Sequence, residues 1–115
     1  ENYYSSAIQY VRSQIVDSEF FVFSDNIERA RTIIGSFNLG ARFIDMRNHK
    51  YSALHDLWLM SNCRHIIAAN STFSWWGSWL SRNENKKIIA PNTWFGPRYS
   101  HWDLSDLYCE NFIKI

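Results

Sequence analysis

The sequence predicts an α/β fold built on a parallel sheet. Two observations carry this prediction: segments with helical spacing of apolar residues alternate strictly with short apolar runs, and these runs are continuous rather than alternating. Continuous apolar strands joined by helices are typical of a parallel sheet with both faces covered. Because crossover connections are right-handed, we expect a three-layer sandwich around a four-stranded parallel sheet, with strands numbered along the chain in the order 2-1-3-4.

Four segments carry apolar residues three and four positions apart, and they predict amphipathic helices. The expected helices cover about residues 3–16, 27–36, 52–63 and 73–82. The expected strands cover about residues 20–23, 41–45, 65–69 and 87–90, and Pro91 closes the last of them. The remainder, 92–115, is expected to be irregular, with Pro97 and scattered aromatic residues.

Length, charge and cysteine content narrow the class of protein. The 115 residues suit one compact domain, and a formal net charge of +1 gives no electrostatic argument for binding nucleic acid. No apolar run approaches the ~20 residues of a membrane span. The two cysteines are too few for a disulfide framework. The chain starts at Glu1 in helical pattern without an initiator Met, so we expect a piece of a longer protein.

The residues directly after the first and third expected strands are the most polar of those that follow a strand in this chain; each such segment is called a strand exit here. Ser24-Asp25-Asn26 follows the first strand, and Asn70-Ser71-Thr72 follows the third. In the expected strand order these exits are neighbours at the point where the order reverses, which is where open α/β sheets bind ligands. The sequence therefore predicts a binding site at this edge.

The exit after the third strand also opens a helix. Backbone N–H groups and the helix N-terminus attract an anion, most often a phosphate. The alternative is that Ser71 or Thr72 merely caps the helix. Asp25 has the same two interpretations, as a ligand for a ribose or nucleobase or as a cap, whereas Asn26 is expected to be the cap itself.

Several familiar sites are missing from the sequence. No Gly-x-Gly-x-x-Gly follows the first strand, and no phosphate-loop motif occurs. The third strand ends in Asn70 rather than in a phosphorylatable Asp, which argues against a receiver domain. The four histidines show no metal-ligand spacing, so we expect no metal site.

Other polar residues have a structural and a functional interpretation. His55 and Asp56 are expected to open the third helix, either as a surface His and a helix-start acid or as groups that reach the ligand. Trp94 follows the fourth strand and is a candidate for the border of the pocket. Arg98 is the basic residue of that neighbourhood, with solvent exposure as its simpler interpretation.

The helix after Asn70-Ser71-Thr72 is rich in tryptophan. Its Trp residues recur at helical spacing and are expected to pack in the core or against another domain. A protein-docking face is the alternative. These residues are Trp75, Trp76 and Trp79.

Four blocks resemble the C-terminal half of bacterial α-1,2-fucosyltransferases, glycosyltransferase family 11. They are residues 20–26, 56–61, 65–80 and 90–95, and the resemblance runs from about residue 3 to 95. The resemblance implies one half of a two-domain GT-B enzyme. It also implies a Rossmann-like GDP-sugar-binding domain over residues 1–96, with 97–115 as an irregular C-terminal extension.

The resemblance implies an inverting transfer of L-fucose without a metal or cofactor, in which a galactose hydroxyl of a glycan attacks C1 of GDP-fucose and GDP leaves. It places Asp25 at the nucleoside and the turn after the third strand at the pyrophosphate. The implied donor-binding residues are Asp25, Asn70, Ser71, Thr72, Phe73 and Ser74, with Asn26, His55, Asp56 and Trp94 as further candidates.

No catalytic residue is expected within the chain. The family's His-x-Arg-Arg-x-Asp phosphate-binding motif is absent from this sequence. We therefore expect the basic clamp, the general base and the acceptor surface in an N-terminal half, and no activity from this piece alone. The expected partners are GDP-fucose, a glycan acceptor and that half. The expected location is the bacterial cytoplasm or the periphery of the inner membrane.

A second hypothesis is a noncatalytic flavodoxin-like module, whose turn after the third strand holds a flavin phosphate or another small anion. A third is a protein-interaction domain that docks a partner on its Trp face. Binding of GDP or of flavin mononucleotide would separate the first two hypotheses.

Overall fold

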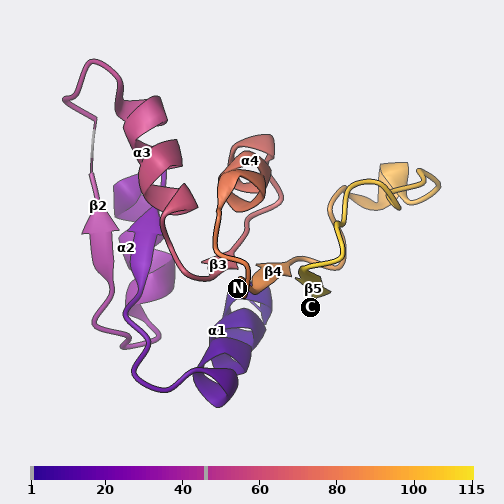
Figure 1. The fold of residues 1–115 in the computed structure, drawn as a ribbon, viewed down its shortest axis with the longest axis horizontal. Coiled ribbons are helices and arrows are strands. Elements are labelled where there is room, and N and C mark those ends of the chain that lie inside the picture. Colours follow the sequence, from indigo (N-terminus) through magenta and orange to yellow (C-terminus); the bar gives the residue numbers. More distant parts are fainter. Residues whose placement is uncertain (1, 46) are drawn as a thin grey trace. The chain divides into compact units, whose positions relative to one another are not determined.

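The computed structural model describes residues 2–45 and 47–115, and within them the chain forms four α-helices, one 3-10 helix and five short strands (Figure 1). The strand pairs of the described residues are parallel. Helices alternate with these strands up to β4, which confirms the predicted α/β class and is consistent with a Rossmann-like fold. The chain divides into two compact units, Glu1–Leu59 and Met60–Ile115.

The first unit contains two parallel strands and the helices around them. Strands β1 and β2 pair with Phe21 opposite Arg42 and Phe23 opposite Ile44, so both carboxyl ends lie at the same edge. The Arg31 guanidinium of α2 lies 4.5 Å from the centre of the Phe43 ring of β2. The elements are α1 (Asn2–Gln14), β1 (Phe21–Phe23), α2 (Ile27–Gly35), β2 (Arg42–Ile44) and most of α3 (Ser52–Ser61).

The helices of this unit follow the predicted apolar pattern. In α1 the residues Ala7, Ile8 and Val11 are buried, and in α2 only 1% of Ile27 is exposed. The chain leaves α2 through a turn in which Gly40 has φ of 61°, a left-handed conformation that glycine adopts without strain.

The second unit is organised around strand β4. This strand pairs with β3 on one side and with β5 on the other. Its three residues, Ile88, Ile89 and Ala90, are at most 1% exposed, as expected for a central strand. The elements are β3 (Ile66–Ile67), α4 (Thr72–Leu80), β4 (Ile88–Ala90), the 3-10 helix η1 (Pro97–Tyr99) and β5 (Phe112–Lys114).

A small apolar cluster supports this sheet. Ile66, Ala68 and Ile88 are its buried members, and the half-buried Cys63 and Phe112 pack against them. Burial raises the pKa of the Cys63 thiol, which keeps it protonated at neutral pH. Cys63 therefore serves as a core thiol, and it is not part of a disulfide.

The predicted four-stranded sheet is wrong in its pairing. The described residues form one sheet of β1 and β2 and another of β3, β4 and β5. The neighbours 2-1 and 3-4 of the expected order are present, but β1 and β3 are not hydrogen-bonded within the described part of the chain. The two-residue β3 has its ladder with β4, through Ile66 N to Lys87 O and Ala68 N to Ile89 O. Apolar runs identify strands but not their partners, which is why the order failed.

Residues 97–115 are more regular than the sequence indicated. They contain η1 and the strand β5, whose Phe112 lies opposite Ile88 of β4. The domain boundary at residue 96 and the three-layer arrangement stay predictions.

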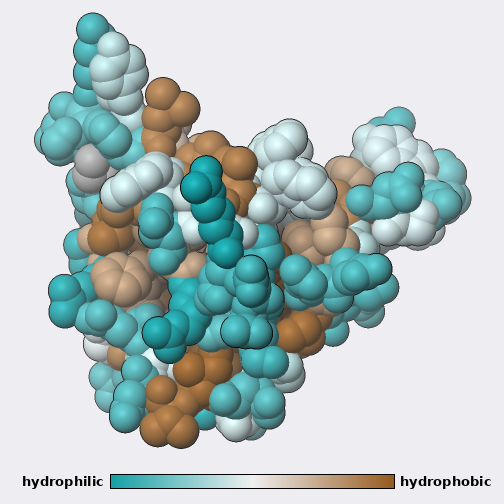
Figure 2. Space-filling view, viewed as in Figure 1, coloured by the Kyte–Doolittle hydropathy of each residue, from teal (hydrophilic) through white to brown (hydrophobic). Residues whose placement is uncertain are grey.

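Some of the exposed surface is hydrophobic. Leu54 and Trp58 of α3 are 65% and 64% exposed, one helical turn apart. Figure 2 shows hydrophobic residues at the surface in the part of the molecule that α3 occupies in Figure 1. Exposed apolar side chains on one face of a helix are typical of contact surfaces.

Candidate functional site

Two serines make hydrogen bonds that shape the turn between β3 and α4. Ser71 is the N-cap of α4, and its Oγ accepts a hydrogen bond from the Ser74 amide at 3.1 Å. The buried Ser74 hydroxyl accepts from the Ala69 amide at 3.0 Å on the other side of the turn. Ser71 thus does the capping that the sequence analysis gave as the alternative to phosphate binding.

Capping leaves two donors of this helix end unused. The carbonyl of Ser71 accepts the first intrahelical bond, from Trp75 N at 3.0 Å. The Thr72 and Phe73 amides precede that bond, and neither has a protein acceptor within the described residues. Both residues are exposed. Two amides at a helix N-terminus, next to the Thr72 hydroxyl, can bind an anion.

The same turn is tied to the loop that leaves β4. Asn70 donates a hydrogen bond from Nδ2 to the Trp94 carbonyl at 3.2 Å. Trp94 is 4% exposed, and its ring packs edge-on against Tyr108 at 6.2 Å. Trp94 therefore contributes its carbonyl to the arrangement of the turn, while its side chain is buried.

The tryptophans of α4 divide between anchoring and exposure. Trp75 donates from Nε1 to the Leu107 carbonyl at 2.8 Å and stacks on Trp79 with ring centres 5.4 Å apart. Trp76 and Trp79 are 50% and 53% exposed. The core interpretation therefore fails for these two residues within this unit, and packing against another domain stays a prediction.

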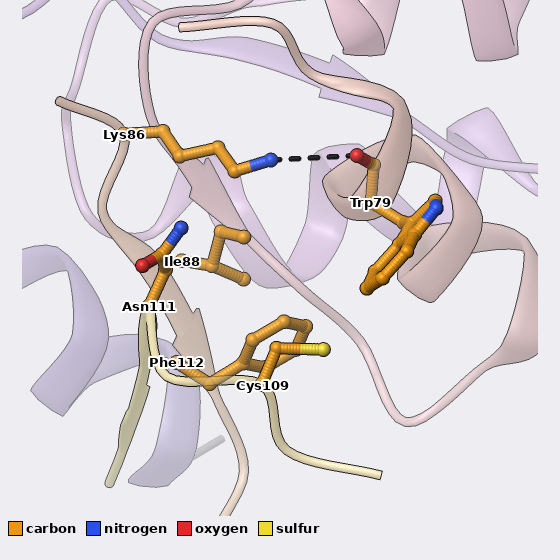
Figure 3. Close-up of a pocket in the computed structure, with 6 residues that line it drawn as sticks. All are labelled: Trp79, Lys86, Ile88, Cys109, Asn111 and Phe112. Atoms are coloured by element: carbon orange, nitrogen blue, oxygen red, sulfur yellow. Dashed lines mark hydrogen bonds between the residues drawn. The ribbon is translucent and has the colours of Figure 1, made fainter. Parts of the chain in front are cut away.

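A small pocket lies at the opposite edge of the sheet. It has a volume of about 190 Å³, and Ile88 and Phe112, which are the first residues of β4 and β5, line it with Trp79 and Lys86 (Figure 3). The Lys86 ammonium donates to the carbonyls of Ser81 at 2.7 Å and Ser78 at 3.0 Å, so it caps the C-terminus of α4. Ligands of parallel sheets bind at the carboxyl ends of the strands, so this pocket is not the candidate site.

In the first unit, the residues after β1 divide into a cap and an exposed acid. Asn26 is the N-cap of α2, and its Oδ1 accepts from the Arg29 amide at 3.0 Å. Ser24 Oγ accepts from the Asn26 amide at 3.1 Å. Asp25 is exposed, and its carboxylate has no hydrogen bond or ion pair within the described residues. The predicted cap is thus confirmed at Asn26, and Asp25 remains open to a ligand.

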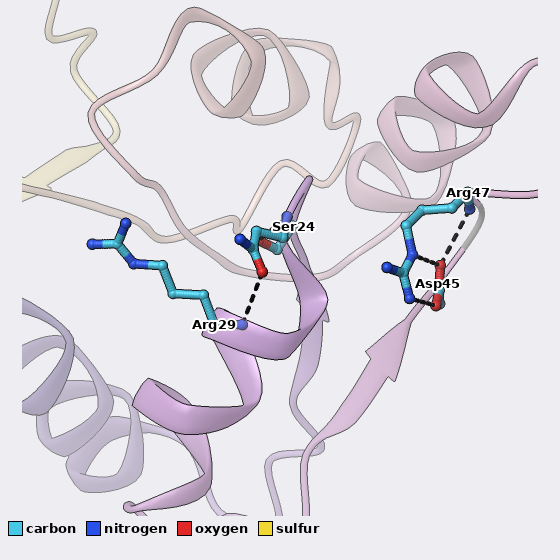
Figure 4. A network of polar contacts seen from close by, with 5 residues as sticks. Ser24, Arg29, Asp45 and Arg47 are labelled. Carbon is cyan, nitrogen blue, oxygen red and sulfur yellow. Dashed lines mark hydrogen bonds and ion pairs between the residues drawn. The ribbon is translucent and has the colours of Figure 1, made fainter.

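An acid–arginine pair that was not predicted from the sequence lies at the same edge. Asp45 follows β2, and its carboxylate accepts two bonds from Arg47, at 2.8 Å from Nε and 2.6 Å from Nη2 (Figure 4). These bonds hold the pKa of Asp45 down at about 2. The predicted parallel pairing could have revealed it, because that pairing puts the end of β2 beside Asp25.

His55 and Asp56 do not open α3 as expected. The helix begins at Ser52, so both residues lie one turn inside it and Asp56 is not a helix-start acid. His55 is exposed, with its ring edge-on to His49 at 6.0 Å. Burial, and then the charge of Asp45, raises the pKa of Asp56, and its Oδ1 is buried without a hydrogen-bond partner among residues 2–45 and 47–115. Whether either residue reaches a ligand stays a prediction.

The predicted site residues fall on both units. Asp25, Asn26, His55 and Asp56 belong to the first, and residues 70–74 with Trp94 belong to the second. Within the second unit the structure brings Asn70, the helix end and the loop of Trp94 together. The expected meeting of Asp25 with Ser71 stays a prediction. No group of three or more His, Cys, Asp and Glu suited to a metal occurs among the described residues.

Comparison with known proteins supplies the family. The model of glycosyl transferase family 11 matches residues 1–115. The chain belongs to glycosyltransferase family 11. It is 40% identical over 98 residues to an alpha-1,2-colitosyltransferase of Escherichia coli, covering 83% of this chain and 32% of that protein. It is 36% identical over 94 residues to the O-antigen biosynthesis glycosyltransferase WbnK of Escherichia coli, covering 82% and 30%.

The chain therefore spans about a third of the length of the family 11 relatives that it matches. No solved structure matches it. In the described parts of the chain, no helix has the length and apolar character needed to cross a membrane.

Proposed function

We propose that this chain binds the nucleotide-sugar donor of an inverting α-1,2-glycosyltransferase, with GDP-fucose as the donor. The observation that carries the proposal is the pair of open amides at Thr72 and Phe73, presented by a helix N-terminus that Ser71 caps from the side. Membership of family 11 supports glycosyl transfer as the reaction.

In the proposed reaction, an acceptor hydroxyl attacks C1 of the donor sugar, the bond from C1 to the phosphate oxygen breaks, and GDP leaves. Negative charge then grows on the leaving phosphate. Fixed amide donors at that point stabilise the transition state, because they need no reorganisation as the charge develops. Thr72 and Phe73 would supply these donors, and Asp25 would accept hydrogen bonds from the nucleoside.

The proposal places other parts of the reaction outside these 115 residues. The general base, the main basic phosphate clamp and most of the acceptor surface would come from the chain that corresponds to the rest of the family 11 relatives. The bacterial cytoplasm is the proposed compartment, because nucleotide-sugar donors are made there. No metal takes part in the proposed step.

Replacement of Thr72 by proline tests the amide contact directly. Thr72 is the first residue of α4, a position where proline is tolerated, and Ser71 before it has φ of −138° and ψ of 145°, which proline accepts in its predecessor. The substitution removes one N–H donor and keeps the helix intact. A hydrogen bond to a charged group contributes about 1.5–3 kcal/mol, so we expect the Kd for GDP to rise roughly tenfold or more.

Titration calorimetry of the 115-residue chain with GDP measures this change, and Thr72→Ala is the control. It removes the hydroxyl but keeps the amide, so its loss of affinity should be smaller. Asp25→Asn should weaken GDP and leave inorganic pyrophosphate unaffected. EDTA should change neither titration. Wild-type affinity of Thr72→Pro for GDP would contradict the phosphate contact, and stabilisation by flavin mononucleotide but not by GDP would favour the flavodoxin-like alternative.

A further inference from the structure

We propose that the loop between β4 and β5 binds a hexopyranose ring, in a pocket formed by Phe95 and Tyr99 with polar residues beside them. The identity of the sugar rests on the proposed function. The expectation that a sugar is a ligand at all rests on membership of family 11. The ring belongs either to the nucleotide-sugar donor or to the acceptor glycan, and both present the same chemistry.

The pocket follows directly on the carboxyl end of β4. It has a volume of about 240 Å³, and its walls combine aromatic rings with amide and hydroxyl groups. Asn92, Thr93 and Ser100 provide the polar groups, and Phe95 and Tyr99 provide the rings. Sugars need both kinds of surface, since their hydroxyls exchange hydrogen bonds and the C–H faces of their rings pack on aromatic rings.

Three aromatic rings gather at this loop and remain open to solvent. Tyr99 and Trp102 have ring centres 4.7 Å apart, and Phe95 lies 5.3 Å from Trp102. Their exposed fractions are 37% for Phe95, 38% for Tyr99 and 50% for Trp102. Three rings that pack on each other while 37–50% exposed form an apolar surface on this loop. Contiguous exposed apolar patches are typical of binding surfaces.

A hydrogen bond connects this pocket with the proposed phosphate turn. Asn70 of that turn donates to the carbonyl of Trp94, the residue before Phe95. The buried Trp94 side chain anchors the start of the loop. A donor sugar is attached directly to the pyrophosphate, and the acceptor hydroxyl must reach its C1. Either ring is therefore expected within a few ångströms of the turn.

Saturation-transfer NMR on the 115-residue chain tests the proposal with separate probes. Methyl β-D-galactopyranoside represents the acceptor, GDP-fucose the donor, and GDP the nucleotide alone. We expect saturation of the aromatic protons to reach the sugar ring of at least one probe. We also expect Tyr99→Ala, which removes one of the rings that line the pocket, to reduce that transfer at least fivefold, with GDP binding unchanged.

Matched variants separate loss of the subsite from loss of the fold. Tyr99→Phe keeps the ring and should retain at least half of the transfer. Tyr51→Ala removes an exposed Tyr that does not line the pocket and should retain all of it. Loss for GDP-fucose alone assigns the pocket to the donor, and loss for the galactoside alone assigns it to the acceptor. Saturation transfer to a sugar ring without any binding of GDP supports this pocket and contradicts the proposed function. No saturation transfer to either sugar, or unchanged transfer in Tyr99→Ala, overturns the pocket whether or not GDP binds.

Discussion

Single hydroxyl groups decide the form of the turn at α4. Ser71 caps the helix, Ser74 accepts from the Ala69 amide, and Ser78 donates to the Ser74 carbonyl at 2.9 Å. Each of these serines is committed to the backbone, and Ser74 and Ser78 are buried. The groups left for a ligand are the exposed ones, namely the Thr72 hydroxyl and the two open amides. The division explains how one short segment can be both a helix cap and an anion site.

At the same scale, we expect His65 to make the stability of the chain depend on pH. Its Nδ1 accepts a hydrogen bond from the Lys87 amide at 3.1 Å. Burial, and then the charges of Arg64 and Lys87, lower the pKa of His65 in the folded state. Below the unfolded pKa of about 6.5 the unfolded chain binds the proton more readily, so the free energy of unfolding falls as the pH drops.

We predict a smaller loss of melting temperature between pH 7 and pH 5 for His65→Asn than for the wild type. Asparagine can keep an acceptor for the Lys87 amide and does not titrate. Differential scanning calorimetry at both pH values measures the loss of melting temperature in each protein. The contributions of the other histidines cancel when the two losses are compared. Equal losses in the two proteins would show that His65 does not contribute.

At the scale of the elements, helix α4 has a face of small residues that allows a close approach. A Cβ on Gly77 would lie 2.8 Å from Met60 Cε and 3.2 Å from Met60 Cβ. The Met60 terminal methyl can move, but its Cβ is fixed by the backbone of α3. The glycine is therefore required for packing, since its φ is not in the left-handed region.

We predict that Gly77→Val destabilises the chain by about 1–3 kcal/mol, the usual cost of overpacking. Urea unfolding followed by circular dichroism measures the change. Gly35→Val is the matched control, because a Cβ at the end of α2 meets nothing within 4 Å. The control should be neutral or slightly stabilising. A loss of similar size in both variants would point to helix propensity or backbone effects instead of the Met60 contact.

At the scale of the whole molecule, the last strand completes the sheet that carries the proposed site. Strand β5 covers one edge of β4, and Ile115 N donates to the Ala90 carbonyl at 3.0 Å. Asn92 N in turn donates to the Ile115 carbonyl at 2.9 Å. The end of the chain thus holds the start of the loop that forms the hexopyranose pocket.

Truncation after Glu110 should therefore expose the edge of β4. An uncovered strand edge pairs readily with other chains, so we predict self-association and loss of near-ultraviolet circular dichroism from the aromatic residues. Sedimentation velocity and spectroscopy measure both effects. Lys114→Ala, which keeps the strand and changes an exposed side chain, is the control. A truncated chain that stays monomeric with an unchanged spectrum would contradict this role of β5.

Local pattern was enough to locate most elements of this protein. Apolar periodicity placed the four helices and the first four strands within a few residues of their observed bounds, because burial of one helix face or of a whole strand shows in the residues themselves. The N-cap at Asn26 and the polar turn before α4 could be predicted for the same reason. The sequence by itself thus determined the α/β class, the family and the position of the candidate phosphate turn.

The tertiary structure decided what depends on partners far apart in the chain. It paired β5 with β4, joined Asn70 to Trp94 and gathered the rings of Phe95, Tyr99 and Trp102 at one loop. It also replaced the expected four-stranded sheet with two smaller sheets. Hydrogen-bond ladders and ring contacts arise between surfaces that exist only after the elements have formed, and no spacing of residues along the chain specifies which surfaces meet.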